Sequence, residues 1–392
     1  MFYENQPVAQ QEQYKRMLSI VGNLSALFSE SNSSYLHYRA HENIFCKYFI
    51  AENLARRDCS ADAKKNRIGI GLKTWVGNDD QKVAEFGQLR ETYQSLTGYE
   101  LARTIAEYRN ERVRVTMNMY GIDEMIYHIV KRVPGSMMII EHAFDSIDLA
   151  NIAIIEGRGN VNNTYFTDGR HTYHFSSSKN TLYMIFDDME VLDEFEVEIM
   201  GDPYNYLMNM VEAQIVTQVA EPTYITYSTP EIDTENRICL RLYSTRHDGT
   251  KFIAERSGLN QWNANGRTRN ANEIYIPYPA EDRANTVGFF PPRDTVFNLT
   301  LPDGRTIPAK VCQADGKAIM SNPNRILGEW LLRNVFELSE GTLITYIMLE
   351  RFGVDSVVFT RESDLQYSVD FSEIGTYERF YNITDIDEMD LC

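Results

Sequence analysis

Apolar residues in the first third of the chain recur every three to four positions, which is the period of amphipathic helices. Between these stretches and after them, short runs alternate apolar with polar residues, which is typical of strands. The segment TYFTDGRHTYHF carries the hairpin signal Asp168-Gly169. We therefore predict helices at residues 8–30, 33–55, 80–96 and 98–111, and strands at 68–76, 113–119, 137–141, 152–156 and within a hairpin over 164–175.

From residue 236 onward the pattern is dominated by strands. One helix interrupts them at 326–335, and Pro302-Asp303-Gly304 predicts a tight turn. Short strands closed by a helix favour a small barrel. The predicted fold class is α+β, with a mixed α/β domain over residues 1–235 and a mostly-β domain over 236–392 that ends in an acidic tail. The strands of the second domain are expected at 238–243, 273–278, 296–301, 306–313 and 354–360.

Charge is unevenly spread along the 392 residues, whose formal net charge is −18. Residues 236–333 carry 14 Lys and Arg against 9 Asp and Glu, whereas residues 361–392 carry 2 against 9. Because the sign of the contacting face decides whether a protein binds phosphate, the acidic total lowers the odds of nucleic-acid binding without excluding it. The five cysteines form no C-x-x-C pair, and neither a signal segment nor a membrane-spanning segment is visible. These features predict a reduced, cytoplasmic protein without structural zinc.

The most informative segment is SGLNQWNANGRTRNANEIYIPYP, which begins at Ser257. Amide and guanidinium side chains surround one indole there. These groups form bidentate hydrogen bonds with the edges of adenine and guanine in the major groove. Gly258 and Gly266 suit a surface arm. The candidate DNA contacts in and beside this segment are Arg256, Asn260, Gln261, Trp262, Asn263, Arg267 and Arg269.

A second constellation lies in the N-terminal domain, in the segment DAKKNRIGIGLK that starts at Asp62 and ends at Lys73. It can fold as a hairpin, and an acid followed about ten residues later by a lysine resembles the PD-(D/E)xK nuclease core. In such a site two carboxylates hold Mg²⁺ while the lysine steadies the attacking water or the phosphate charge. Two departures stand out: no proline precedes Asp62, and Gly71 occupies the usual place of the second acid.

The resemblance supplies three further candidates for the nuclease site. A subgroup of these nucleases moves the second acid onto the following helix, and Glu85 has the matching position on a predicted helix. Glu42, on the preceding helix, is expected to supply a further ligand. Asp58 competes with Asp62 for its role, so the expected metal ligands are Asp62 and Glu85, and the expected catalytic residues are Asp62, Lys73, Glu85 and Glu42.

The sequence gives less support to other kinds of catalytic or metal site. His37 and His41 share a helix face but lack a third ligand, while His171 and His174 lie on opposite faces of a strand and are expected to be structural. No G-x-S-x-G, Walker A or dinucleotide glycine pattern occurs, which removes the commonest hydrolase, ATPase and Rossmann interpretations. There is no H-x-K pair, which argues against a phospholipase-D-type nuclease as well.

Several ordered blocks of the second domain resemble the C-terminal recognition domain of certain type II restriction endonucleases, which is similar to the plant B3-type pseudobarrel. The blocks are ERSGLNQWNANGRTRNANEIYIPYP, FFPP, LPDG and KAIMSNPNRILGEWLLR. In relatives, two arms reach into the major groove. The resemblance implies one arm within Arg256 to Arg269. It implies a second arm with Lys317, Ser321, Asn322, Asn324 and Arg325.

Two hypotheses about the function follow, one for an enzyme and one for a DNA-binding protein. The first is a Mg²⁺-dependent type II restriction endonuclease, a homodimer that cleaves double-stranded DNA, in which the B3-like domain selects the site and the N-terminal domain hydrolyses phosphodiester bonds. The second is a non-catalytic, sequence-specific DNA-binding or regulatory protein. The missing acid at Gly71 favours the second, and Glu85 at the migrated position favours the first.

Overall fold

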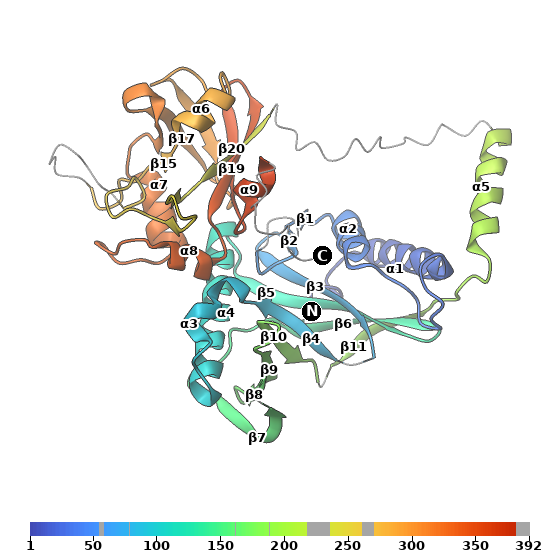
Figure 1. The fold of residues 1–392 in the computed structure, drawn as a ribbon. Coiled ribbons are helices and arrows are strands. Elements are labelled where there is room, and N and C mark those ends of the chain that lie inside the picture. Colours follow the sequence, from blue (N-terminus) through green and yellow to red (C-terminus); the bar gives the residue numbers. More distant parts are fainter. Residues whose placement is uncertain are drawn as a thin grey trace. The chain divides into compact units, whose positions relative to one another are not determined.

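The computed structural model describes residues 1–54, 59–77, 79–160, 162–187, 189–217, 236–260 and 270–381, and it has the mixed α+β content that the pattern predicts (Figure 1). These residues divide into two compact units. Unit 1 holds the chain up to Asn110, apart from Cys59, and again from Ile122 to helix α5 (Pro203–Thr217). Unit 2 holds Cys59, Glu111–Gly121 and the chain from strand β12 onward. None of the helices in the described ranges is long and apolar enough to cross a bilayer.

A six-stranded mixed sheet organises unit 1. Its strand order is β1-β2-β3-β5-β6-β11, and all neighbours are antiparallel except β3 and β5, which run parallel. Between these two parallel strands the chain passes through β4 and the helices α3 and α4. The bounds are β1 Glu52–Asn53, β2 Ala63–Lys65, β3 Ile68–Val76, β5 Glu124–Val133, β6 Ser136–Ala143, β11 Val191–Glu196, α3 Arg90–Tyr93 and α4 Gly98–Tyr120.

Helices α1 (Val8–Asn23) and α2 (Tyr38–Phe49) cover one face of this sheet. Their apolar stripes bury Tyr14, Phe45 and Phe49 against Ile70 and other side chains of the sheet. Alternation along β3 turns Ile70 and Leu72 toward these helices, so that Gly69, Gly71 and Lys73 face the other way. Both helices are shorter than the predicted ranges, because the chain after α1 forms the short 3₁₀ helix η1 (Ser25–Leu27) and α2 ends at a left-handed Ile50.

A second sheet of unit 1 has five antiparallel strands in the order β4-β10-β9-β8-β7. The predicted hairpin is confirmed: β8 and β9 pair on either side of a turn in which the Asp168 carboxylate accepts the amides of Arg170 and His171, and Gly169 has a φ of 83°. The bounds are β4 Asp80–Glu85, β7 Ala153–Asn160, β8 Asn163–Thr167, β9 Thr172–Ser176 and β10 Thr181–Ile185.

Two elements that the sequence pattern predicted are wrong, one in unit 1 and one where helix α4 passes into unit 2. Residues 80–85 form strand β4 instead of a helix, because they pair with β10, about a hundred residues later in the chain. Helix begins again only with η2 (Gly87–Leu89) and α3. Residues 113–119, with their alternating β-branched pattern, continue helix α4 up to Tyr120. Tertiary packing overrides local β propensity here.

Unit 2 is built around a seven-stranded sheet in the order β12-β19-β20-β16-β17-β18-β15 (Figure 1). Its edge strands β12 and β15 contact each other, so the sheet curves into a near-barrel, and Phe290, Phe297 and Tyr367 stack in its interior. Of the predicted 273–278 strand only β15 forms. The strands are β12 Arg237–Arg241, β15 Ile276–Pro277, β16 Val296–Thr300, β17 Thr306–Cys312, β18 Ala318–Ser321, β19 Ser356–Ser363 and β20 Gln366–Ser372, beside a separate pair β13 Ser244–Thr245 and β14 Lys251–Phe252.

Short helices complete unit 2. The predicted 326–335 helix is confirmed as α7 followed by a π-helical stretch, η4. The bounds are α6 Ala280–Asn285, η3 Ala314–Gly316, α7 Ile326–Gly328, η4 Glu329–Val335, α8 Tyr346–Phe352 and α9 Thr376–Phe380.

The end of helix α4 is part of unit 2, which the predicted division at residue 235 did not include. The Tyr120 hydroxyl donates to Asp370 at 2.9 Å, and Arg351 donates to Glu111 at 2.7 Å. Asn118 donates to the carbonyl of Val335. The second unit is therefore assembled from three separate stretches of sequence.

Candidate functional site

The β2–β3 hairpin fixes the position of Asp62. Asn66, at the tip of the hairpin, has a left-handed φ of 56°, which asparagine tolerates in a tight turn. The Asp62 amide donates to the carbonyl of Ile70 at 2.9 Å, and its carboxylate accepts the amide of Leu72 at 2.7 Å. The predicted hairpin is confirmed, and the acid at its start is held against the strand that carries Lys73.

Glu42, Asp62 and Lys73 lie near enough for their charges to influence one another's pKa, and we call these three residues the acid–lysine cluster. Burial raises the pKa of Glu42, as does the neighbouring Asp62 carboxylate, while an ion pair with Arg39 at 2.9 Å opposes the rise. Burial lowers the pKa of Lys73, against the attraction of Asp62 and Glu42. Two carboxylates that repel each other beside a partly buried lysine, with the pKa of Glu42 raised and that of Lys73 lowered, mark a candidate functional site.

The structure gives a physical reason for the glycine at position 71. A Cβ atom there would lie 2.9 Å from Phe144 Cε1 and 2.9 Å from Tyr127 Cδ1, two rings that stack with their centroids 4.0 Å apart. No carboxylate side chain fits at this position without displacing the rings. A second acid for the cluster has to come from another element, and Glu42 of α2 lies close enough to interact with Asp62.

Glu85 lies at the end of strand β4, not on the helix that its candidacy assumed. Its side chain is 53% exposed and forms an ion pair with Lys82. Lys82 in turn lowers the pKa of Lys73, so β4 borders the cluster. Asp58, the competitor for the Asp62 role, lies outside the described residues.

The donor set of the cluster fits Mg²⁺ better than zinc. Magnesium keeps several waters and binds through one or two carboxylates together with substrate phosphates, whereas structural zinc takes four Cys or His ligands. Glu42 and Asp62 match the first pattern. In the part of the chain that the structure describes, no three His, Cys, Asp or Glu residues lie close enough to form a metal cage.

A buried hydrogen-bond network holds α1, α2 and the sheet together, and it is the feature that sequence reasoning missed. The Tyr14 hydroxyl lies 2.8 Å from Nε2 of His41 and 3.0 Å from Nε2 of His128, and His128 Nδ1 lies 3.3 Å from Glu141. Glu141 also accepts the amides of Phe2 and Tyr3. These partners are far apart in the sequence, so no local pattern joins them.

The histidines that the sequence analysis considered as ligands, apart from His41, have contacts typical of a structural role. His37 caps helix α2 by accepting the amide of Arg39. His174 stacks between Tyr165 and Tyr183 and lies 3.2 Å from the Asp80 carboxylate. His171 packs beside His142.

In unit 2 the first predicted arm divides into described and undescribed residues. Arg256 is exposed. Asn260 is buried, and its amide is already engaged: it donates to the carbonyls of Ala254 and Ile344 and accepts the amide of Ile344 at 2.7 Å. Asn260 therefore supports the arm and does not present its amide to a base. Gln261, Trp262, Asn263, Arg267 and Arg269 lie outside the described residues.

The second predicted arm follows strand β18. Lys317, Asn322 and Arg325 are exposed, and Asn324 is partly buried, 3.4 Å from Glu273. Ser321 is fully buried: its hydroxyl donates to the carbonyl of Pro323 and accepts the amide of Leu327. Ser321 thus shapes the turn into α7, while its neighbours remain available to a ligand.

Arg333 clamps the segment that returns from the first arm. Its guanidinium donates to the carbonyl of Ala271 and the side chain of Asn272, each at 2.8 Å, and to the carbonyls of Leu338 and Ser339. Gly328 permits this approach, since a Cβ atom there would lie 1.9 Å from the carbonyl oxygen of Asn272. The two predicted arms are therefore tied to a single helix.

We predict that Arg333→Ala loosens the first arm. Hydrogen bonds to charged groups contribute about 1.5–3 kcal/mol each, and three carbonyls, two of them part-buried and one exposed, lose their donor together, so unfolding should require about 2–3 kcal/mol less free energy. Specific DNA affinity should fall at least about tenfold. Urea unfolding and gel shifts measure the two effects, with Arg379→Ala, an exposed arginine paired to Glu373, as the control. Unchanged affinity in Arg333→Ala would show that the clamp does not support binding.

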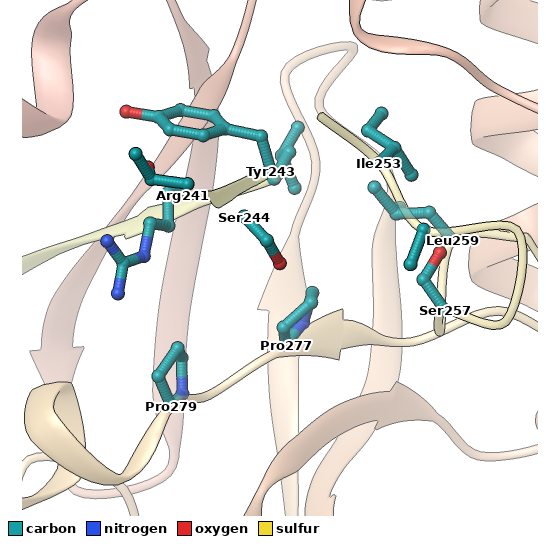
Figure 2. Close-up of a pocket in the computed structure, with 11 residues that line it drawn as sticks. Arg241, Tyr243, Ser244, Ile253, Ser257, Leu259, Pro277 and Pro279 are labelled. Carbon is teal, nitrogen blue, oxygen red and sulfur yellow. The ribbon is translucent and has the colours of Figure 1, made fainter. Parts of the chain in front are cut away.

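A cavity of about 290 Å³ lies next to the start of the first arm. In Figure 2 the β12–β13 segment lines one side of it, Pro277 and Pro279 a second, and the chain around Ser257 a third. Arg241 at its edge is engaged within unit 2, since its guanidinium lies over the Tyr377 ring and 3.8 Å from Glu281. The labelled lining residues are Arg241, Tyr243, Ser244, Ile253, Ser257, Leu259, Pro277 and Pro279.

Residues 235–363 match the family described as the NgoFVII C-terminal B3-like DNA-binding domain. The match covers the strands of the near-barrel from β12 to β19 and includes both predicted arms. The near-barrel of the second half of the chain thus matches a B3-like DNA-binding domain, as the resemblance implied. No curated protein matches the chain.

Proposed function

We propose that this protein is a type II restriction endonuclease that cleaves double-stranded DNA at a specific sequence by Mg²⁺-dependent phosphodiester hydrolysis. The observation that carries the proposal is the acid–lysine cluster in a chain that also contains a B3-like DNA-binding domain. The match to a domain of a restriction enzyme supports the same class.

The local arrangement supports a PD-(D/E)xK-like site in unit 1. An acid leads into the first strand of a hairpin, a lysine lies on the returning strand, and a glutamate comes from the preceding helix. This is the arrangement that the resemblance implies, with Glu42 in place of the missing acid at Gly71. We therefore propose Glu42 and Asp62 as the metal ligands and withdraw Glu85 from the metal site, because it lies on an exposed strand end with Lys82 as its partner.

Each residue of the cluster has a distinct role in hydrolysis. When bound by Glu42 and Asp62, Mg²⁺ supplies Lewis-acid stabilisation of the phosphate charge. Lys73 places its ammonium group where it steadies the attacking water or the charge that develops on the phosphate. The Leu72 amide holds the Asp62 carboxylate in place through the 2.7 Å hydrogen bond. Catalysis is therefore expected to rest on positioning and electrostatics.

Sequence recognition is assigned to the two arms of the B3-like domain. The exposed cations and amides Arg256, Lys317, Asn322 and Arg325 are the described candidates for DNA contact. Base edges in the major groove are read by arginine and asparagine, while lysine contacts to phosphate position the protein without reading sequence.

Arg325→Ala and Lys317→Ala should have different effects on binding. Loss of an arginine that reads guanine costs about 1–3 kcal/mol and relaxes preference at one base pair. Loss of a phosphate contact weakens binding to all sequences alike and lowers the salt slope by about one. Gel shifts of the full chain with cognate, single-mismatch and random duplexes at several salt concentrations separate the two. Equal losses on every sequence for both variants would contradict base reading by Arg325.

A non-catalytic DNA-binding or regulatory protein is the second candidate. It is favoured by the glycine at position 71 and by the number of acids in the described site, which has two and not three. Digestion of unmethylated phage DNA, once with Mg²⁺ and once with EDTA, separates the two functions. Discrete fragments formed only with Mg²⁺ would support the endonuclease. Intact DNA in both reactions, together with specific binding, would support the regulator. For either function we propose the cytoplasm as the location.

A further inference from the structure

The tip of the β2–β3 hairpin gathers positive charge beside the acid–lysine cluster. Residues 64–67 have the sequence KKNR. Arg67 forms an ion pair with Asp123, and the Lys65 ammonium group donates to the neutral side chain of Gln6 at 2.6 Å. Neither Lys64 nor Lys65 forms an ion pair with a carboxylate in the part of the chain that the structure describes. The hairpin tip therefore holds two lysine charges that remain available to an anion.

A groove of about 500 Å³ opens at this hairpin tip. It is lined by Ile50, Glu52, Lys64, Lys65 and Asn66. Glu52 lies opposite Lys64 in the pairing of β1 with β2, but no ion pair joins the two side chains. The lining residues thus offer two ammonium groups and one amide to a ligand, against a single carboxylate. Such a donor set fits a phosphate group, because lysine binds phosphate as a compact point charge with three N–H donors.

Alternation along the hairpin places Lys64 on the same face of the sheet as two members of the cluster. Ala63 is fully buried against the helices α1 and α2, so its neighbours Asp62 and Lys64 face the other way. Asp62 continues the strand, since its amide donates to the carbonyl of Ile70. Lys73 of β3 also lies on the face away from the helices. From the hairpin tip inward, the order on this face is therefore Lys64, Asp62 and Lys73.

The spacing of these residues suits two neighbouring phosphates of one DNA strand. Residues two apart on a β-strand, such as Asp62 and Lys64, are separated by about 6.4–6.8 Å. Neighbouring phosphates along a DNA strand have a comparable separation. A phosphate that reacts between Asp62 and Lys73 therefore has its neighbour within reach of Lys64. The flexible stem of lysine allows its ammonium group to follow that phosphate.

We propose that Lys64, with Lys65 and Asn66 beside it, binds the DNA phosphate adjacent to the scissile one and so positions the scissile phosphate at the acid–lysine cluster. The inference rests on the proposed function, because it takes the cluster as the place of cleavage. The contact belongs to unit 1 and is separate from the two arms of the B3-like domain. Because it is made to the DNA backbone, it aligns the duplex without reading its sequence.

Duplexes with a single methylphosphonate test this contact, because that group removes the charge of one phosphate. In gel shifts of the full chain without Mg²⁺, a methylphosphonate next to the cut position should weaken binding about tenfold, and Lys64→Met should weaken binding to the unmodified duplex equally. Lys64→Met should then be insensitive to that methylphosphonate, since both changes remove the same contact. The variant should also lower the salt slope by about one. Lys64→Arg keeps the charge and should keep the sensitivity.

Lys179→Met is the matched control, because it removes an exposed lysine of unit 1 in the turn between β9 and β10. It should bind nearly as the unmodified chain does and keep the sensitivity to the methylphosphonate. If Lys64→Met remains sensitive at every position of a methylphosphonate scan, Lys64 does not contact the backbone. Coupling only to a phosphate more than one nucleotide from the mapped cut would overturn the placement. A chain that shows coupling at one phosphate but cuts no DNA with Mg²⁺ would retain the lysine–phosphate contact, while the endonuclease proposal fails.

Discussion

Asp62→Ala and Lys73→Ala are expected to slow DNA cleavage by at least about 10²–10³-fold each while leaving specific binding nearly unchanged. The large effect follows from the proposed chemistry, because catalysis of phosphodiester hydrolysis depends on positioned charge and the proposal places each of these residues as a charge at the reacting centre. Binding survives because the arms belong to the B3-like domain, a separate part of the fold. Single-turnover cleavage of a cognate duplex and gel shifts with Ca²⁺ measure the two properties separately.

The glutamates provide a matched comparison within the same experiment. Glu42→Gln removes a buried carboxylate that interacts with Asp62, and it should lower the cleavage rate as strongly as Asp62→Ala. Glu85→Gln removes an exposed carboxylate at the end of β4 and should cleave within a few-fold of the parental rate. A severe loss in Glu85→Gln with normal cleavage in Glu42→Gln would restore the assignment based on sequence spacing. Parental rates in both Asp62→Ala and Lys73→Ala would exclude the cluster as the active site.

Removal of metal is the second large effect. Excess EDTA should abolish cleavage, and Mg²⁺ should restore it, because two carboxylates beside a lysine bind a hard cation through oxygen. Ca²⁺ should support specific binding without cutting, since it occupies an oxygen site but has looser geometry than Mg²⁺. Plasmid digestion with each metal, at fixed ionic strength, gives the result.

Two controls sharpen the metal experiment. Asp62→Ala should show no rescue by Mg²⁺ at any concentration that restores the parental protein. Arg379→Ala, an exposed change in unit 2, should retain the parental metal dependence. Cleavage that persists in EDTA would identify a metal-independent nuclease and contradict the proposed chemistry.

The sequence determined those features that depend on neighbouring residues. The β2–β3 hairpin, the turn at Asp168-Gly169 and the helix after Pro323 were predicted correctly, because each has its turn or capping chemistry within a few residues. The motifs of the B3-like domain are also local blocks in order along the chain, and the family match confirms them.

Tertiary structure alone decided features whose partners are distant in the chain. Strand β4 forms because β10 pairs with it, and α4 extends to Tyr120 because its end packs in unit 2 against Asp370. Asn260 has the composition of a base reader, yet its amide bonds a carbonyl and an amide of Ile344. Spacing along a strand or helix likewise says nothing about which carboxylate lies near Asp62, whereas in the structure the Asp62 charge raises the pKa of Glu42.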